Sequence, residues 1–311
     1  MPDFIDAHHH LWNYTPIEYD WIDDEMSALR RDFTAADFSS LGVALDLSGS
    51  VAVQARQTLE ETHWLLACAA KYPTIRGVVG WVPLASEELP EILADLARNP
   101  LFKAVRHVVQ EEPDPEFLLR DDFNRGIARL QPHNLAYDIL IRDHQLPQTA
   151  RFVEQHPNQS FVLDHLAKPR VRERLLEPWS SDLKRLAAHP NVVCKLSGLV
   201  TEADWKTWTL GDLRPYLDTA LELFGPARLM AGSDWPVCLL ATSYNHWWAT
   251  LIEWAKPLTP SERACIFGDT ATRIYRLTTR DEGPAPDPRI DLDIPSNSNR
   301  SISPLSRRKP A

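Results

Sequence analysis

Two histidines one residue apart lie at the end of the first apolar run of the chain. The run is Phe4–His10, and it contains an acidic residue rather than the Gly/Ser linker that accompanies a purification tag. If it forms a β-strand, its side chains alternate between two faces, so His8 and His10 project to one side and His9 to the other. Two imidazoles placed in this way can bind one divalent cation such as zinc. A surface histidine cluster without a ligand is the alternative interpretation.

Ionisable residues also end four later apolar runs. Arg106 and His107 follow one of these runs, and His165, Lys195 and Asp234 each follow or end another. In a barrel enzyme the working residues sit at the C-terminal ends of the strands. Charged side chains recurring at this place in otherwise apolar segments therefore indicate one shared site.

His8, His10, His165 and Asp234 would supply three imidazoles and one carboxylate. This set can bind one divalent metal, with Asp234 shared between the ion and an attacking water molecule. The alternative for His165 is a polar residue that caps a strand, and the alternative for Asp234 is a helix cap or turn residue before Pro236.

Arg106, His107 and Lys195 are candidates for contact with a substrate. The planar guanidinium of Arg106 suits an oxygen-rich ligand, and His107 could donate a proton to a leaving oxygen. Because neighbours on a strand face opposite ways, at most one of these two points into the barrel. Lys195 could polarise a carbonyl group. A buried salt bridge for Arg106 and a surface position for Lys195 remain open.

Short β-rich runs alternate with longer stretches of helical periodicity over the first ~280 residues. The predicted strands are Phe4–Asp6 (extending toward His8), Gly49–Gln54, Ile75–Trp81, Phe102–Arg106, Leu135–Ile141, Ser160–Asp164, Val192–Leu196 and Arg228–Gly232. The predicted helices are Leu59–Lys71, Glu87–Ala97, Asp121–Leu130, Leu146–Glu154, Leu183–Ala188 and Leu213–Leu223. Eight strands alternating with helices predict an α/β protein with a (β/α)₈ TIM barrel.

An open, doubly wound sheet is the competing fold, but no glycine-rich phosphate turn follows the first strand, and the chain has only 11 glycines. The segment Leu11–Leu47 is long for a connection between a strand and a helix, and we expect it to form a loop over the barrel mouth before the first helix. From Asp281 to Ala311 the composition is polar and proline-rich, which predicts a disordered tail after a single barrel domain of residues 1–280.

The amino-acid composition limits the classes of molecule that this protein is expected to bind. The net charge of −10 comes without a basic stripe, which argues against nucleic acid and anionic membranes. The four cysteines lack C-x-x-C spacing, so a disulfide framework is not expected. The N-terminus has no basic n-region, and no apolar stretch approaches the ~20 residues of a membrane span. We expect a cytoplasmic protein, and composition leaves open whether it forms a homo-oligomer.

The 11 tryptophans are numerous for a core of this size. Trp12, Trp81 and Trp235 lie beside polar residues in the sequence, and aromatic faces over a polar cleft suit sugar rings and other cyclic ligands. We expect these three, with the loop Trp12–Trp21, to pack against a substrate. The alternative is that they belong to the core or to a subunit interface.

Five segments together resemble the amidohydrolase-related sugar lactonases, the branch typified by L-fuconolactonase and L-rhamnonolactonase, with the pyrone-dicarboxylate lactonase as a more distant relative. They are Asp6–Trp12, Gly77–Val82, Val162–Pro169, Lys195–Leu199 and Gly232–Val237, and they stand in the family's order. The resemblance covers Met1 to about Thr279. It implies a (β/α)₈ barrel that hydrolyses a lactone ester.

The resemblance implies one divalent metal at most, with zinc as the first candidate. The fourth strand offers no carboxylated lysine or bridging glutamate, and the fifth ends without a histidine, which argues against a binuclear centre. Members of this branch can also work with no metal, so the ion could be dispensable.

The leading hypothesis is therefore a sugar-lactone hydrolase in which Asp234 activates water near His8, His10 and His165. Arg106, Lys195 and His107 would stabilise the oxyanion or protonate the leaving ring oxygen. A metal-dependent, non-oxidative decarboxylase on the same barrel is the second hypothesis, and a non-catalytic sugar-binding barrel is the third. The Trp-Pro pair after Asp234 and the Lys-Leu-Ser-Gly segment favour the lactonase.

Overall fold

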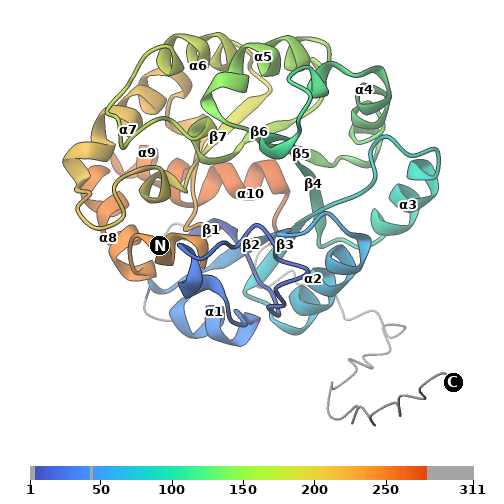
Figure 1. Cartoon of the computed structure of the whole chain (residues 1–311), viewed down its shortest axis with the longest axis horizontal. Coiled ribbons are helices and arrows are strands. Elements are labelled where there is room, and N and C mark those ends of the chain that lie inside the picture. The colour runs from blue at the N-terminus through green and yellow to red at the C-terminus, as the bar shows by residue number, and fades with distance from the viewer. Residues whose placement is uncertain (1–3, 43–44, 279–311) are drawn as a thin grey trace, which may run out of the picture.

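Eight parallel strands form a ring in the order in which they occur along the chain (Figure 1). The computed structural model describes residues 4–42 and 45–278. The strands are β1 (Ile5–His9), β2 (Gly49–Val53), β3 (Ile75–Gly80), β4 (Phe102–Val108), β5 (Ala136–Leu140), β6 (Phe161–Leu163), β7 (Val192–Leu196) and β8 (Leu229–Ala231). The ring is completed between β8 and β1, where Asp234 N donates to His8 O (2.8 Å) and His10 N donates to Trp235 O (2.6 Å).

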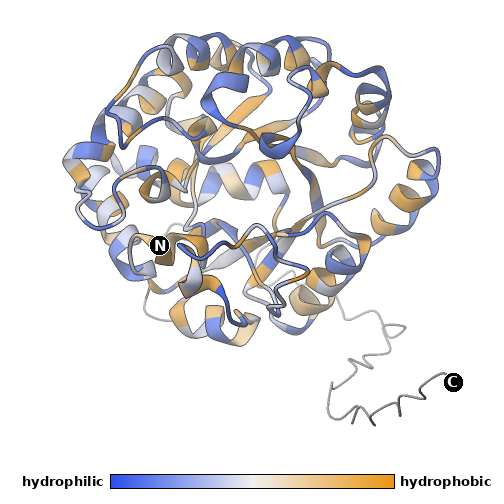
Figure 2. Ribbon diagram, in the orientation of Figure 1, coloured by the Kyte–Doolittle hydropathy of each residue, from blue (hydrophilic) through white to orange (hydrophobic). Residues whose placement is uncertain are grey.

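Helices surround this ring, and the longer ones pack an apolar face inward while their outer faces are mostly polar (Figures 1 and 2). They are α1 (Ala35–Gly42), α2 (Leu59–Lys71), α3 (Leu89–Leu96), α4 (Asp121–Ile127), α5 (Leu146–Glu154), α6 (Trp179–Ala187), α7 (Leu210–Phe224), α8 (Tyr244–Trp254), α9 (Pro260–Ala264) and α10 (Thr270–Tyr275). The local sequence determines where several of these helices begin or end. Thr58 caps α2 by accepting a hydrogen bond from Glu61 N, and Gly225 ends α7.

Small apolar residues of the strands fill the inside of the barrel, and α10 covers their N-terminal ends. Ala271, Tyr275 and Leu277 join this inner cluster. Lys103, near the start of β4, donates its Nζ proton to Arg276 O at 2.9 Å. Because α10 closes the lower end, a ligand can reach the barrel residues only from the ends of the strands where the histidines lie.

The (β/α)₈ barrel predicted from the sequence is confirmed, and no strand end differs from the prediction by more than three residues. One expectation is wrong. The segment Leu11–Leu47 is not a loop that precedes the first helix, because α1 lies within it, where Phe38 packs into the core. The helices after β8 were not predicted, and the predicted tail from Asp281 lies outside the described residues.

All four cysteines are free. In the described part of the chain, no helix has both the length and the apolar character needed to cross a membrane.

Candidate active site

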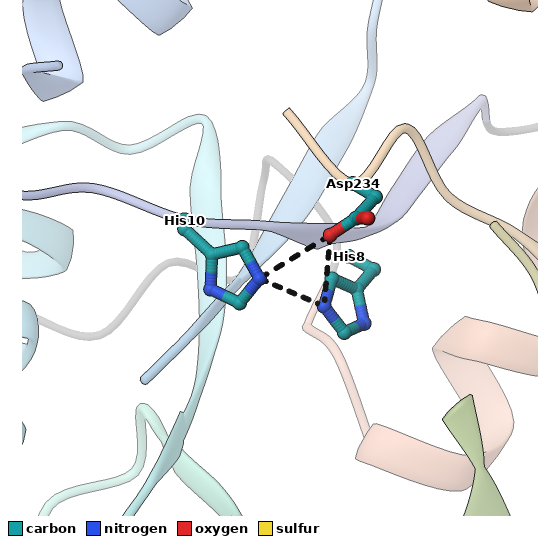
Figure 3. A group of neighbouring side chains, drawn as sticks. All are labelled: His8, His10 and Asp234. Carbon is teal, nitrogen blue, oxygen red and sulfur yellow. Dashed lines mark hydrogen bonds and ion pairs between the residues drawn. The ribbon is translucent and has the colours of Figure 1, made fainter. Parts of the chain in front are cut away.

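His8, His10 and Asp234 converge at the seam between β1 and β8 (Figure 3). The Nε2 atoms of the two histidines lie 3.1 Å apart, and Asp234 Oδ1 is 3.3 Å from His10 Nε2 and 3.7 Å from His8 Nε2. His9 points away, since it stacks on Phe38 and bonds Ser50 Oγ. The alternation expected from a strand thus places both outer histidines on one side.

The three ligand atoms lie 3.1–3.7 Å apart, within about 0.2 Å of the spacing of ligands around one zinc ion. Two ligands about 2.0–2.2 Å from a tetrahedral zinc lie roughly 3.3–3.6 Å from each other. His10 Nδ1 is 2.8 Å from Val53 O. A backbone carbonyl accepts only from N–H, so this contact leaves the His10 Nε2 lone pair free for a cation. When His8 carries its own proton on Nε2, the same 3.1 Å contact is instead a hydrogen bond between the two rings.

His165 borders the same site from the turn after β6. Its ring centroid is 4.5 Å from that of His8, and its Nε2 is 3.9 Å from Asp234 Oδ1. Its Nδ1 contacts Ser197 Oγ at 2.9 Å. All four predicted ligands are therefore brought together. With Asp164, His8 and His165 make up a second group of potential ligand atoms.

A buried network of charges lies beneath these residues. Lys195 Nζ contacts Asp138 Oδ2 (2.5 Å), Asp164 Oδ1 (3.0 Å) and His8 Nδ1 (3.1 Å). Tyr275, on α10, donates its hydroxyl proton to Asp138 Oδ2 at 2.7 Å. Lys195, Asp138 and Asp164 are fully buried. The lysine thus contacts two carboxylates below the site.

The environment keeps Asp234 ionised and the imidazoles of His8 and His165 neutral. Burial would raise the pKa of Asp234, but His165, His10 and His8 outweigh burial and hold it below its usual value. Burial lowers the pKa of His165 to about 4 and that of His8 well below its usual value, although nearby carboxylates oppose the shift. An ionised carboxylate beside neutral imidazoles can accept a proton from water or bind a cation.

Arg106 forms a buried salt bridge, which was the alternative to contact with a substrate. Its Nη1 is 3.0 Å from Asp164 Oδ2, and its side chain is 4% exposed. His107 does not join the cluster. It faces the other way along β4, stacks on Phe117, and contacts Glu112 Oε1 at 2.6 Å and Trp81 Nε1 at 3.3 Å. As expected, only one of the two neighbours points into the barrel.

A family profile described as Amidohydrolase matches residues 5–277. The chain belongs to the amidohydrolase family. It is 43% identical over 284 residues to an L-fucono-1,5-lactonase of Burkholderia multivorans, covering 88% of this chain and 96% of that one. It is 36% identical over 278 residues to an L-fucono-1,5-lactonase of Burkholderia ambifaria, covering 88% and 95%. A crystal structure of a Burkholderia multivorans amidohydrolase with bound zinc superposes with a TM-score of 0.86 at 42% identity, covering 89% of this chain and 100% of that one.

Two of the three tryptophans expected to contact substrate are buried in the core of this amidohydrolase, although the Trp12 ring centroid lies 6.5 Å from that of His10. Trp12 is fully buried and donates to Arg31 O, and Trp235 is 2% exposed and packs against Phe33 and Phe38. Both belong to the core, as the alternative interpretation allowed, because the segment that contains α1 folds over them. Trp81 is partly exposed.

Sequence reasoning missed Asp138, Asp164 and Tyr275 as members of this amidohydrolase site. Asp138 could have been found, since it is the only charged residue in an apolar strand. Asp164 stands directly before His165 but was given no role. Tyr275 gave no signal, because its contact with Asp138 spans 137 residues of sequence.

Proposed function

We propose that this amidohydrolase hydrolyses the ring ester of a sugar lactone, with L-fucono-1,5-lactone as the first candidate. The curated relatives with that activity match nearly all of their own length. The observation that carries the proposal is that the Asp234 carboxylate lies beside the imidazoles of His8, His10 and His165 at the mouth of a closed barrel. The decarboxylase alternative is less well supported.

In the proposed reaction, Asp234 takes a proton from water while the water oxygen attacks the lactone carbonyl carbon. The tetrahedral oxyanion then collapses, and the bond between carbonyl carbon and ring oxygen breaks. The proton held by Asp234 passes to the ring oxygen, which leaves as a hydroxyl group, and the product is an aldonic acid. One water is consumed for each ester opened.

Positive charge near the carbonyl oxygen would stabilise the oxyanion. Lys195 lies under His8 and is fully buried, so its charge acts through the network rather than by open contact with solvent. His8, His10 and Asp234, with His165 beside them, would hold a divalent metal such as zinc, which supplies a Lewis acid when bound.

Acid release from a panel of aldonolactones, followed with a pH indicator, tests the proposal. We expect turnover of L-fucono-1,5-lactone and slower turnover of lactones with other hydroxyl stereochemistry. Carbon dioxide release from hydroxybenzoates, with no acid release from any lactone, would establish the decarboxylase instead.

The role of the metal is tested by elemental analysis of the active protein. We expect about one divalent ion per chain and its loss in a His10→Ala variant. Full turnover by protein that contains no metal would show that the imidazoles and Asp234 are sufficient.

A further inference from the structure

A cavity of about 550 Å³ opens among the segments that follow β5, β6 and β7, and Lys168 at the end of the His165 turn is part of its wall. Its wall includes Arg142, Lys168, Glu202 and Trp205, and Glu25 lines it from the segment between β1 and α1. Ligand pockets of this size hold small organic molecules. The cavity belongs to the same mouth of the barrel as Asp234 but is lined by residues that the reaction above does not use.

Two connections tie this cavity to the site. Lys168 ends the turn that carries His165, and its backbone N–H donates to His165 O at 2.8 Å. Glu202 lies on the loop after Ser197 and Gly198, which pack on the His165 ring. Burial raises the pKa of Glu202, Lys168 opposes this rise, and the charge of Asp234 adds to it. The Glu202 carboxylate is therefore within electrostatic range of the proposed base.

Lys168 and Glu202 are partly buried, whereas Glu25, Arg142, Arg170, Arg172 and Glu173 around the same cavity are exposed. Arg170 pairs with Asp143 at 2.8 Å, and Arg142 pairs with Glu111 at 3.2 Å. Neither the Lys168 Nζ nor the Glu202 carboxylate has a hydrogen bond or ion pair to any described residue, although both side chains are partly buried. Lys168 and Glu202 attract each other electrostatically but form no hydrogen bond, so their donors and acceptor oxygens favour a ligand that supplies the hydrogen bonds.

The balance of charge identifies the chemistry of that ligand. The cavity is lined by four basic and four acidic side chains, so neither an anion nor a cation is favoured overall. A hydroxyl group can donate to a carboxylate and accept from an ammonium at the same time. Trp205 adds an apolar face of the kind that packs on sugar rings. A neutral, polyhydroxylated ring satisfies all three features.

We propose that Lys168 and Glu202 form a subsite that binds the ring hydroxyls of the substrate and sets which sugar lactone is accepted. Glu202 accepts hydrogen bonds from hydroxyl groups, Lys168 donates to a hydroxyl oxygen, and the ester is directed toward Asp234. This inference rests on the proposed lactonase activity and names the residues that choose its substrate.

The test uses Glu202→Gln and Lys168→Met in the full-length protein. Glu253→Gln is the matched control, since Glu253 is exposed on the outer helix α8. The first readout is the kinetics of L-fucono-1,5-lactone hydrolysis. A hydroxyl subsite predicts a KM raised about 10- to 100-fold with kcat within a few-fold, because the lost contacts bind substrate and transition state alike. The control should match the wild type.

The second readout is calorimetric binding of L-fucose, a ring with the same kind of hydroxyls and no ester. We expect binding by the wild type and the control, and weaker binding by both variants. If either variant fails to fold, Glu202→Asp or Lys168→Arg replaces it, since these keep the charge but displace it, and a smaller rise in KM is expected.

An unchanged KM and unchanged L-fucose binding in both variants would overturn the subsite and leave the lactonase activity standing. A fall in kcat at constant KM would also overturn it, because the residues would then act on the chemistry. Conversely, a wild type that hydrolyses no lactone but binds L-fucose through Glu202 would remove the proposed function and keep the subsite. Absence of both hydrolysis and binding would remove both.

Discussion

At the scale of single residues, Asp234 is the group on which the proposed reaction depends most. Asp234→Asn keeps the size of the side chain but cannot accept the proton from water. We expect turnover to fall about 10²–10⁴-fold, the usual cost of losing a positioned general base. Steady-state kinetics measure the fall, and an unchanged thermal unfolding curve would show that the fold is intact. Near-normal turnover would assign the base to another residue, with His165 the first to examine.

Glu61 lies away from the candidate active site and makes the stability of the folded protein depend on pH. Its side chain is 1% exposed, and burial raises its pKa from the usual 4.5 to about 7, although hydrogen bonds from Arg56 N and Ala55 N oppose the rise. The folded protein therefore binds this proton more tightly than the unfolded chain does. The stabilisation is complete below pH 4.5 and is lost as the pH rises through about 7.

Glu61→Gln should remove this dependence, because the amide stays neutral and its oxygen can still accept the backbone hydrogen bonds. We expect the variant to be more stable than the wild type at pH 8, by on the order of 1–3 kcal/mol, and no more stable at pH 4.5. Urea unfolding at the two pH values measures the difference. Glu60→Gln, on the exposed neighbour, is the control, and an equal effect in both variants would contradict the assignment.

The residues that could be predicted from the sequence are those that end a strand. His8, His10, His165 and Asp234 could be placed together because all parallel strands of a barrel end at one mouth. Asp138 lies in the middle of β5 and Tyr275 on α10, so a search of strand ends could not find them. Arg106 could be recognised as a charged residue at a strand end, but the sequence did not predict that Asp164 is its partner.

At the scale of elements, the turn after β6 carries backbone strain at the site. His165, Leu166, Ala167 and Lys168 all have φ between 51° and 58°, and none of them is a glycine. Such residues each cost about 1–2 kcal/mol in the left-handed region, so the surrounding packing must hold the turn in place. The result is that His165 and Lys168 are fixed on the two sides of one turn, facing the cluster and the cavity.

Gly198 provides the space that this turn requires. Its φ is +67°, and a Cβ there would lie 2.5 Å from His165 Nδ1. We expect Gly198→Ala to displace the imidazole and lower turnover at least tenfold. Gly225→Ala is the control for backbone strain, because Gly225 also has a φ of +67° but no atom within 4 Å of its added Cβ. Both variants should lose stability from the backbone alone, and the loss should be larger at Gly225, whose ψ of 163° is almost confined to glycine, than at Gly198, whose ψ is −2°. Equal turnover in the two variants would contradict a steric effect on His165.

The strands were easier to predict than the helices that follow them. Each strand is a short apolar run between turn residues, and this pattern is local. The helix α1 was missed because it is short and lies in an acid-rich segment that is mostly irregular. The small helices after β8 were missed because long-range packing, rather than their own periodicity, holds them on the barrel.

At the scale of the whole molecule, truncation can separate what α10 contributes to turnover and stability from what the residues after it contribute. Every residue placed in the site lies between His8 and Tyr275. We expect a chain that ends at Arg280 to keep its turnover and its melting temperature. A chain that ends at Asp269 should lose both, because it removes the Tyr275 contact with Asp138 and uncovers the inner cluster. Deleting one buried aromatic side chain typically costs about 3–5 kcal/mol. Loss of turnover in the longer chain would show that the last 31 residues support the barrel.

The seam between β1 and β8 sets the order in which the enzyme can become active during its synthesis. The ribosome releases His8 and His10 among the first residues, but Asp234 follows more than two hundred residues later and Tyr275 later still. Until then the histidines have no carboxylate partner from β8, and the first strand presents one unpaired edge. Nascent chains shorter than about 275 residues should therefore lack activity altogether. Chaperones that shield strand edges would be expected to act on this protein before its last helix has emerged.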